Sequence, residues 1–345
     1  MMQSAGLFCS LVVAAAAGCG PREGLTDAGS GADAGARDAG VRDAGARDAG
    51  ARDAGARDAG LGGAGWTRFE LVGGEVVEGE VVATYDHARW WWNPEAVLTT
   101  AVFDPRQLHP WPDDRSLRFL RSTEVVRELP VARPDGALSY TSTLRASHVE
   151  LQRVPLDGVA YVITGGERYH LEENGYGDFA WDLVRRDSSG RRFLRDGAAN
   201  EDYFVFDDPV FLPTAGVVVE VVDDAPDRVP GPTDLDAINN LVGVQVYGGF
   251  YIYLLHLRQG SVPSSVTVGA RLEAGAMVGR VGNSGVSVEP HLHVVMHAAD
   301  PRGDPSRLWS VPAEWTDVYA GTGRRPRLRD FVVPTSGMYL SNTPF

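Results

Sequence analysis

The sequence predicts an all-β protein. From Trp66 onward, short runs of β-branched and aromatic residues alternate with polar ones, and Gly, Pro and Asp separate these runs at short intervals. Alternation with a period of two is typical of strands, and the intervening residues are those that turns require. No helical pattern extends beyond a turn or two. We therefore expect an N-terminal β-sandwich-like module followed by a C-terminal antiparallel β domain.

The N-terminus predicts an export signal. An apolar run from Leu7 to Ala17 is too short to cross a membrane as a mature helix and has the size of a signal-peptide core. The stretch AAGC, which ends at Cys19, resembles the lipobox of bacterial lipoproteins. This resemblance implies that residues 1–18 are removed and that Cys19 becomes lipid-modified. An ordinary secretory signal with an incidental cysteine is the alternative, and the n-region contains no Lys or Arg.

Residues 19–65 are expected to form a flexible linker. From Arg37 to Gly60 the chain repeats ARDAG almost without variation, and VRDAG occurs once. Gly at every fifth position disfavours a helix, neighbouring Arg and Asp cancel their charges, and no residue of the repeat can build a core. As a flexible coil this segment would have an r.m.s. span of roughly 35–40 Å.

Residues 66–154 are expected to form a β-rich accessory module. The strand candidates are EVVEGEVVATY, AVLTTAVF, LRFLRSTEVV, ALSYTSTLRA and HVELQRV. The run Trp90-Trp91-Trp92 could offer a sugar-stacking platform, but consecutive strand residues point to opposite faces, which favours ordinary packing. A second β-rich region, residues 155–345, begins with VPLDGVAYVITGG and ends in further strands.

Composition excludes several kinds of chemistry. All 32 basic residues are arginine, so Schiff-base, P-loop, lipoyl and biotinyl lysines are absent. The two cysteines, Cys9 and Cys19, lie at the extreme N-terminus, so the folded region can form neither a disulfide nor a thiolate metal site. The formal net charge of -14 argues against a nucleic-acid partner. Any metal must be held by histidines and carboxylates.

The motif that carries chemistry is GNSGVSVEPHLHVVMH, residues 282–297. Three of the eight histidines lie in this stretch. In a strand, His291 and His293 point to the same face, Pro290 suits the first strand position and GNSG supplies a turn. Two such imidazoles can both bind a metal, or one can be a ligand and the other an acid or base. We place His297 in a supporting role or at the surface. An H-x-H pair alone is a weak motif.

Three further residues strengthen the motif. His256 lies in the apolar run YIYLLHLRQGSV, and Asp182 lies in the apolar run FAWDLV. A carboxylate in such a strand needs a partner, and a divalent cation is a suitable one. His170, in GGERYHLEEN, adds another imidazole. His87, His109 and His148 have no companions at ligand spacing.

Taken together, these residues resemble the lysostaphin/LytM-type zinc metallopeptidases, which cleave the peptide part of peptidoglycan. The resemblance covers most of residues 155–297 in the right order, including the strand histidine, the segment VTVGARLEAGAMVGRVGNSG and the sequence EPHLHVVM. It implies a compact antiparallel β-fold with a groove and one Zn²⁺ on its floor. An exported lipoprotein of this kind would lie at the cell envelope, anchored to a membrane.

The resemblance also implies roles for the residues. His170, Asp182 and His293 would be the metal ligands, and His256 and His291 would be the catalytic pair that is not bound to zinc. Many members of the family place the first histidine and the aspartate four positions apart, whereas twelve positions separate them here. Asp178, Glu172 and Glu173 are therefore rival carboxylate ligands.

The implied function is hydrolysis of peptidoglycan peptide cross-links by a zinc endopeptidase. The sequence does not fix the oligomeric state, and we favour a monomer. One alternative keeps the fold but not the activity, as a non-catalytic regulator of other wall enzymes. Another is a cell-wall-binding lipoprotein in which residues 66–154 bind the wall. A lipoyl- or biotinyl-like carrier, suggested by VTVGARLEAGAMVGRVG, is excluded by the absence of lysine.

Overall fold

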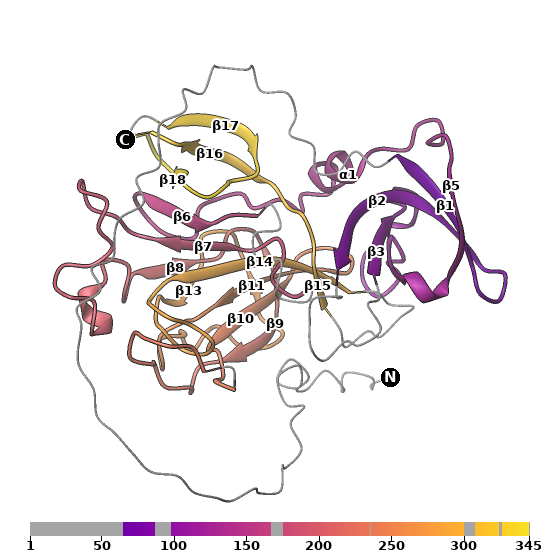
Figure 1. Ribbon diagram of the computed structural model, residues 1–345. Helices are drawn as coiled ribbons and strands as arrows, with labels where there is room; N and C mark the ends of the chain where they lie inside the picture. Colours follow the sequence, from indigo (N-terminus) through magenta and orange to yellow (C-terminus); the bar gives the residue numbers. More distant parts are fainter. Residues whose placement is uncertain are drawn as a thin grey trace, which may run out of the picture.

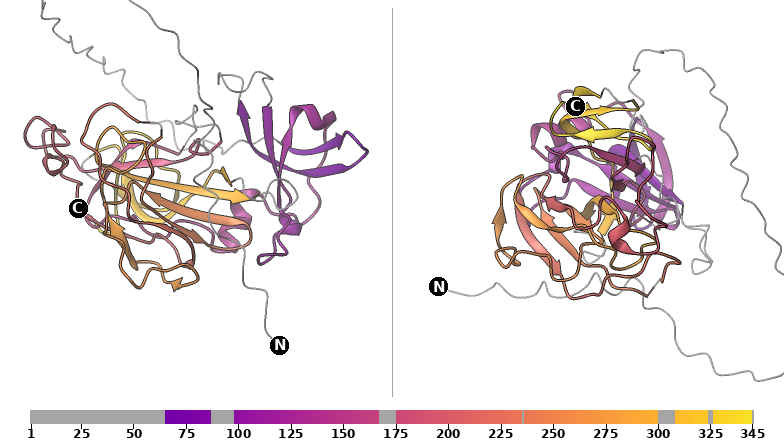
Figure 2. Two further views of the ribbon diagram at one scale, coloured as in Figure 1. Left: turned by 90° about the horizontal axis from the view of Figure 1, so that it is seen from below. Right: turned by 90° about the vertical axis from the view of Figure 1, so that its left-hand side faces the viewer.

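The computed structural model describes residues 65–86, 98–166, 175–234, 236–299, 308–323 and 326–344. Nearly all regular structure in these ranges is β, so the predicted all-β class is confirmed. Figure 1 and the left view of Figure 2 show a smaller sheet of indigo and magenta strands at one side of a larger one. Among the described residues, no helix has the length and hydrophobicity needed to span a membrane. Cys19 and the ARDAG repeat lie outside the described residues.

The smaller sheet belongs to the accessory module. Its strands are β1 (Trp66–Leu71), β2 (Val76–Asp86), β3 (Leu98–Phe103), β4 (Leu117–Arg121) and β5 (Val125–Pro130), with 3₁₀ turns η2 (Pro105–Gln107) and η3 (Ser122–Glu124). They pair antiparallel in the order β4-β3-β2-β1-β5. Among the described residues of the module these strands form a single sheet, and no second sheet of the module completes the expected sandwich. One face packs around Phe69 and Leu120, while Phe103 and Phe119 belong to the core that continues into the larger sheet.

Two predicted strands are wrong. The run ALSYTSTLRA forms the helix α1 (Tyr140–Ala146) because local capping decides its conformation. Oγ of Ser139 accepts a hydrogen bond from the backbone N–H of Ser142 at 3.2 Å. This side-chain acceptor satisfies a free donor of the first turn. The run HVELQRV likewise contributes only an isolated bridge, between Leu151 and Trp315.

The larger sheet is built from residues 155–345 and carries the histidine motif. Its strands are β6 (Ala160–Thr164), β7 (Trp181–Val184), β9 (Gly216–Val222), β10 (Leu241–Gln245), β11 (Phe250–Leu255), β12 (Arg271–Leu272), β14 (Leu292–Ala299), β15 (Leu308–Ser310), β16 (Trp315–Gly321), β17 (Arg327–Val332) and β18 (Tyr339–Ser341). The order is β12-β9-β10-β11-β14-β7-β6-β18-β16-β17, with β15 paired to β14. The strands β8 (Pro209–Phe211) and β13 (Met277–Arg280) form a separate pair, and η4 spans Asn200–Asp202.

The centre of the larger sheet is fully buried. Every residue of β7, β11 and β14 is buried, so these strands read as continuous apolar runs in which a polar side chain stands out. Asp182 and His293 are two such polar side chains. The apolar surroundings of these strands therefore fix where the polar groups of the motif can gather.

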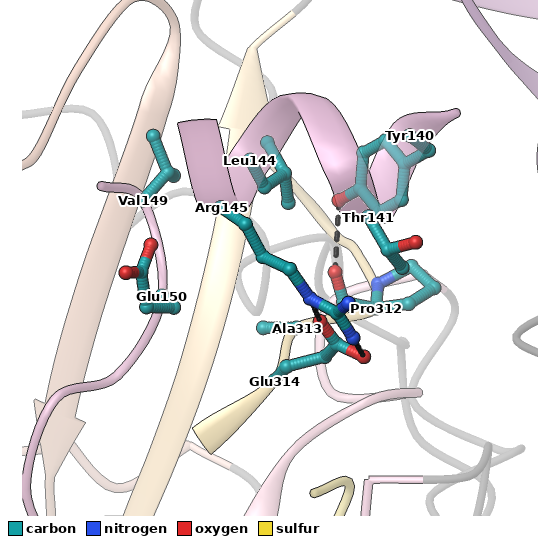
Figure 3. Close-up of a pocket in the computed structure, with 9 residues that line it drawn as sticks. All are labelled: Tyr140, Thr141, Leu144, Arg145, Val149, Glu150, Pro312, Ala313 and Glu314. Carbon is teal, nitrogen blue, oxygen red and sulfur yellow. Dashed lines mark hydrogen bonds and ion pairs between the residues drawn. The ribbon is translucent and has the colours of Figure 1, made fainter. Parts of the chain in front are cut away.

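The helix α1 docks the accessory module onto the larger sheet. Figure 3 shows Tyr140 and Arg145 pointing from α1 toward the segment 312–314. The hydroxyl of Tyr140 donates to the carbonyl oxygen of Pro312 at 2.8 Å, and the guanidinium of Arg145 makes two 2.8 Å hydrogen bonds to the carboxylate of Glu314. A cavity of only about 10 Å³ lies between them, roughly the space of one water molecule.

Candidate metal centre

The centre is built on the pairing of β14 with β7. In the register of these antiparallel strands, His293 lies directly opposite Asp182. Directly opposed residues of neighbouring strands present their side chains on one face and close together. Nδ1 of His293 is accordingly 3.0 Å from Oδ1 of Asp182. Both side chains are buried.

His291 reaches the same carboxylate from just before β14. Its Nε2 lies 3.5 Å from Oδ1 of Asp182. Its Nδ1 is 2.8 Å from the carbonyl oxygen of Glu289 and 3.3 Å from Oγ of Ser287. Because a carbonyl oxygen can only accept, Nδ1 of His291 carries the hydrogen. The atom that His291 presents to the centre is therefore Nε2.

His256 completes the cluster from the end of β11. Its backbone adopts a left-handed conformation with φ of 63°, which is uncommon for a residue other than glycine. Its Nδ1 donates to the carbonyl oxygen of Ser284 at 2.8 Å. The ring centroid of His256 lies 4.5 Å from that of His291 and 5.7 Å from that of His293. Three chain segments that are distant in sequence thus meet at one point.

Burial favours the neutral form of His256. Burial lowers the pKa of His256 well below its usual value, and the neighbouring His291 and His293 lower it further. The carbonyl of Ser284 and the carboxylate of Asp182 act in the opposite direction but do not overcome burial. A neutral His256 whose Nδ1 carries the hydrogen has a lone pair on Nε2.

The donor set suits zinc. The nearest ligand atoms of His256, His291 and His293 all lie within 4.8 Å of one another. Imidazole nitrogens and a carboxylate oxygen are the ligands that zinc takes at about 2 Å in tetrahedral geometry. Two ligands of one such ion stand about 3.3 Å apart, close to the separations between Asp182 and both His291 and His293. The three histidines are also a possible ligand set by themselves.

The structure brings together four of the five predicted residues, namely Asp182, His256, His291 and His293. His170, Glu172 and Glu173 lie outside the described residues. Of the two aspartates considered as a ligand, Asp182 lies 3.5 Å from His291 and 3.0 Å from His293. Oδ2 of Asp178 instead accepts a hydrogen bond from the backbone N–H of Gly175 at 2.7 Å.

The other histidines are distributed as follows. His297 is fully buried, so a surface position for it is wrong, and its Nε2 donates to the carbonyl oxygen of Tyr176 at 2.7 Å. The side chain of His148 is 81% exposed, and His109 is also exposed. His87 and the three tryptophans 90–92 lie outside the described residues.

A polar network that the sequence did not reveal supports His256. The backbone N–H of Asn240 donates to Oγ of Ser284 at 2.9 Å, and this Oγ donates to the carbonyl oxygen of Leu257 at 2.8 Å. The side-chain amide of Asn240 in turn donates to the carbonyls of Ala225 and Leu257. The network ties the GNSG turn to the end of β11 and so aims the Ser284 carbonyl at His256. Only the turn itself could have been recognised from the sequence.

Comparison with known proteins gives one match to a family. Residues 202–305 match the model of peptidase family M23, a range that includes His256, His291 and His293 but begins after Asp182. No curated protein matches the chain.

Several solved structures resemble the chain over part of its length. The lytM structure from Ruminococcus gnavus has 17% identity and a TM-score of 0.30, and the match covers 50% of this chain and 61% of that one. The catalytic domain of EnpA, a prophage-encoded M23 protein from Enterococcus faecalis, has 20% identity and a TM-score of 0.24, with 44% and 88% covered. A zinc-containing peptidase from Vibrio cholerae has 13% identity and a TM-score of 0.29, with 71% and 55% covered.

Proposed function

We propose, from the premise that residues 202–305 form a peptidase family M23 domain, that the chain is a zinc-dependent endopeptidase acting on the peptide cross-links of peptidoglycan. One observation carries the proposal. Nε2 of His291 and Nδ1 of His293 lie 3.5 and 3.0 Å from Oδ1 of the buried Asp182, and His256 adds a third imidazole. A buried carboxylate among three imidazoles is costly unless charge compensates it, and a divalent cation does so.

In this proposal Asp182 and His293 hold the ion together with His170. When bound, zinc supplies Lewis acidity that polarises the scissile carbonyl and lowers the pKa of water toward neutrality. The contact between Asp182 and His293 orients both groups before the ion binds. The pairing of β7 with β14 keeps these two side chains on one face through backbone hydrogen bonds.

His256 and His291 handle protons. Each commits its Nδ1–H to a backbone carbonyl, Ser284 for His256 and Glu289 for His291, so that each presents Nε2 to the centre. Neutral His256 can accept the proton of the attacking water at Nε2. His291, once protonated at Nε2, can donate to the developing oxyanion and to the leaving amine. The hydrolysis then needs no covalent enzyme intermediate.

The decisive experiment measures zinc and cleavage together. Metal content by mass spectrometry and muropeptide release from purified sacculi would be measured on the full chain, His293→Ala and the control His109→Ala. His109 is exposed, so its loss leaves the centre intact. We expect about one zinc per wild-type chain. We also expect cleavage by the wild type and the control, and loss of both properties in His293→Ala.

The other outcomes separate the alternatives. One zinc without cleavage would favour a non-catalytic regulator with the same fold. Absence of zinc from the wild type would contradict the endopeptidase and favour a wall-binding scaffold. Binding of sacculi by a His293→Ala chain that no longer cleaves would show that wall recognition and catalysis are separable.

The location of the enzyme is proposed on the N-terminal segment alone. Cys19 would carry a lipid that anchors the chain at the cell envelope, and residues 19–65 would tether the folded part to the membrane. Labelling cells with a clickable palmitate analogue tests this. We expect label on the wild type and none on Cys19→Ala, whereas an unlabelled wild type would contradict the anchor.

A further inference from the structure

The segment 175–180 leads directly into β7 and Asp182. Within it, the backbone N–H of Ala180 donates to the carbonyl oxygen of Gly177 at 3.0 Å, and Asp178 accepts from the N–H of Gly175. His297 of β14 donates to the carbonyl oxygen of Tyr176. Every residue of the segment except Tyr176 is buried. The position of this segment therefore sets how the chain approaches the candidate metal centre.

Strand β15 holds this segment from the other side. The N–H of Ser310 donates to the carbonyl oxygen of Gly175 at 2.6 Å, and Oγ of Ser310 accepts from the N–H of Phe179 at 2.9 Å. The ring of Trp309 packs so closely on Gly175 that a Cβ there would lie 2.5 Å from Cε3 of the indole. Both ends of the segment are thus bound to Ser310.

The accessory module holds β15 in turn. The hydroxyl of Tyr85, on β2, donates to the carbonyl oxygen of Ser310 at 2.5 Å. The ring of Tyr85 lies 5.0 Å from that of Trp309, and the ring of Phe119, on β4, stacks on Trp309 at 5.0 Å with an interplanar angle of 10°. Tyr85 also meets Phe179 edge to face. Ser310 therefore links the module to the segment through its own three polar groups.

The contact is buried rather than loose. Tyr85 is 1% exposed, and Tyr85 and Phe119 belong to the same buried cluster as Phe179 and Trp309. A domain carried on a flexible linker makes smaller and more polar contacts with its neighbour. An aromatic hydroxyl buried with a hydrogen-bond partner fixes both position and orientation.

We propose that Tyr85 and Ser310 are positioning residues, through which residues 66–154 fix the 175–180 segment and thereby the metal affinity of the Asp182 centre. The proposal rests on the proposed function, because it assumes that the centre binds zinc. The accessory module is then a structural part of the enzyme. It is not only a targeting module for the cell wall.

The test compares two tyrosines on the full chain. Tyr85→Phe and Tyr140→Phe each remove one buried hydroxyl that donates to a backbone carbonyl in residues 310–312. Figure 3 shows the bond of Tyr140 to Pro312, a residue that lies outside both strand β15 and the 175–180 segment. Three quantities would be measured: zinc affinity by competition with a chromophoric chelator, thermal stability of the metal-free chain, and amide hydrogen exchange of residues 175–180.

We expect both variants to lose similar thermal stability. Only Tyr85→Phe should weaken zinc binding, by about tenfold. This is the lower end of the loss seen when a residue that supports a metal ligand is removed. Only Tyr85→Phe should also speed amide exchange in residues 175–180. Ser310→Ala, which keeps the backbone bonds but removes the acceptor for Phe179, should weaken zinc binding as well.

Equal zinc affinities and equal exchange rates in the two tyrosine variants would overturn the proposal. Failure of the proposed function is distinguishable from this result. A wild-type chain that binds no zinc would contradict the proposed function, and hydrogen exchange would still decide the positioning. Faster exchange in Tyr85→Phe than in Tyr140→Phe would support the role of Tyr85, and equal exchange would exclude it.

Discussion

His293 and Asp182 face each other across the antiparallel strands β14 and β7, with Nδ1 of the histidine 3.0 Å from Oδ1 of the aspartate. This pair distinguishes Asp182 from the rival Asp178. Asp182→Asn keeps the shape of the side chain but removes its charge. Loss of a residue that only hydrogen-bonds to a metal ligand typically lowers metal affinity by roughly 10–100-fold, and we expect a larger fall in zinc affinity here. The measurement is competition with a chromophoric chelator.

Asp178→Asn provides the matched control. An asparagine oxygen can still accept the hydrogen bond from the N–H of Gly175, so the turn is preserved. We expect near-normal zinc affinity in this variant. A larger loss in Asp178→Asn than in Asp182→Asn would reverse the assignment of the carboxylate ligand.

The GNSG turn requires a glycine at position 285. Gly285 has a φ of 74°, and a Cβ there would overlap the side chain of Asn239 and lie 2.8 Å from its Cα. We expect Gly285→Ala to cost about 2–5 kcal/mol of unfolding free energy, the sum of backbone strain and overpacking. Urea denaturation measures the loss. The same variant should displace the Ser284 carbonyl from His256.

Gly190→Ala separates the two contributions. Gly190 has a φ of 87°, but nothing lies within 4 Å of the position of its Cβ. This variant should lose only roughly 1–2 kcal/mol, from the left-handed backbone. Equal losses in the two variants would show that the packing against Asn239 does not matter.

The shared core predicts a single unfolding transition for the two parts of the chain. Leu120 is 1% exposed and belongs to the cluster on the outer face of the smaller sheet. Leu120→Ala should cost about 2–5 kcal/mol and lower the melting temperature of the whole folded part. Scanning calorimetry measures this. Two separate transitions, only one of them shifted, would contradict the prediction. Val126→Ala, at a site 68% exposed, should leave the melting temperature nearly unchanged.

Glu220 should make stability depend on pH. Burial raises the pKa of Glu220, and the hydrogen bond from the hydroxyl of Tyr253 lowers it only in part. A carboxyl group whose pKa is raised in the folded state contributes stability that is fully present below its unfolded pKa and lost as the pH rises through its folded pKa. Glu220→Gln removes this loss. We therefore expect Glu220→Gln to become more stable relative to the wild type as the pH rises from 4 to 7 in urea denaturation. A constant difference across that range would contradict the burial effect.

Strand positions and the shared face of two histidines could be predicted because they depend on local alternation. Asp182 was recognisable because a carboxylate in an apolar strand needs a partner. The pairing of Asp182 with His293 joins strands 111 positions apart, so no hairpin turn sets their register, and two uniformly buried strands offer no alternation that would set it. The left-handed turn at His256 depends on a network that includes Asn240, a residue without a distinctive neighbourhood in the sequence.

The error at α1 has a local cause of a different kind. Residues 137–146 alternate small, aromatic and β-branched residues, which is typical of a strand. The hydroxyls of Ser139 and Thr143 instead bond within the first turn, and the buried side chains Tyr140 and Leu144 are spaced as on one helix face. The docking of Tyr85 against β15 was equally beyond prediction, because it joins residues separated by more than 200 positions.

The contact between the accessory module and Ser310 limits how this module can be exchanged between proteins. The sequence places the end of the accessory module at residue 154, yet the surface that receives the module is made by Trp309, Ser310 and the segment to Glu314, far toward the C-terminus. A recombination crossover at residue 154 alone would exchange the module but not residues 309–314. The contact between them would then be made by two surfaces that do not match. Transplantation of this module into another protein of this fold would therefore require two insertions, one on each side of the strands β7, β11 and β14 that form the candidate metal centre.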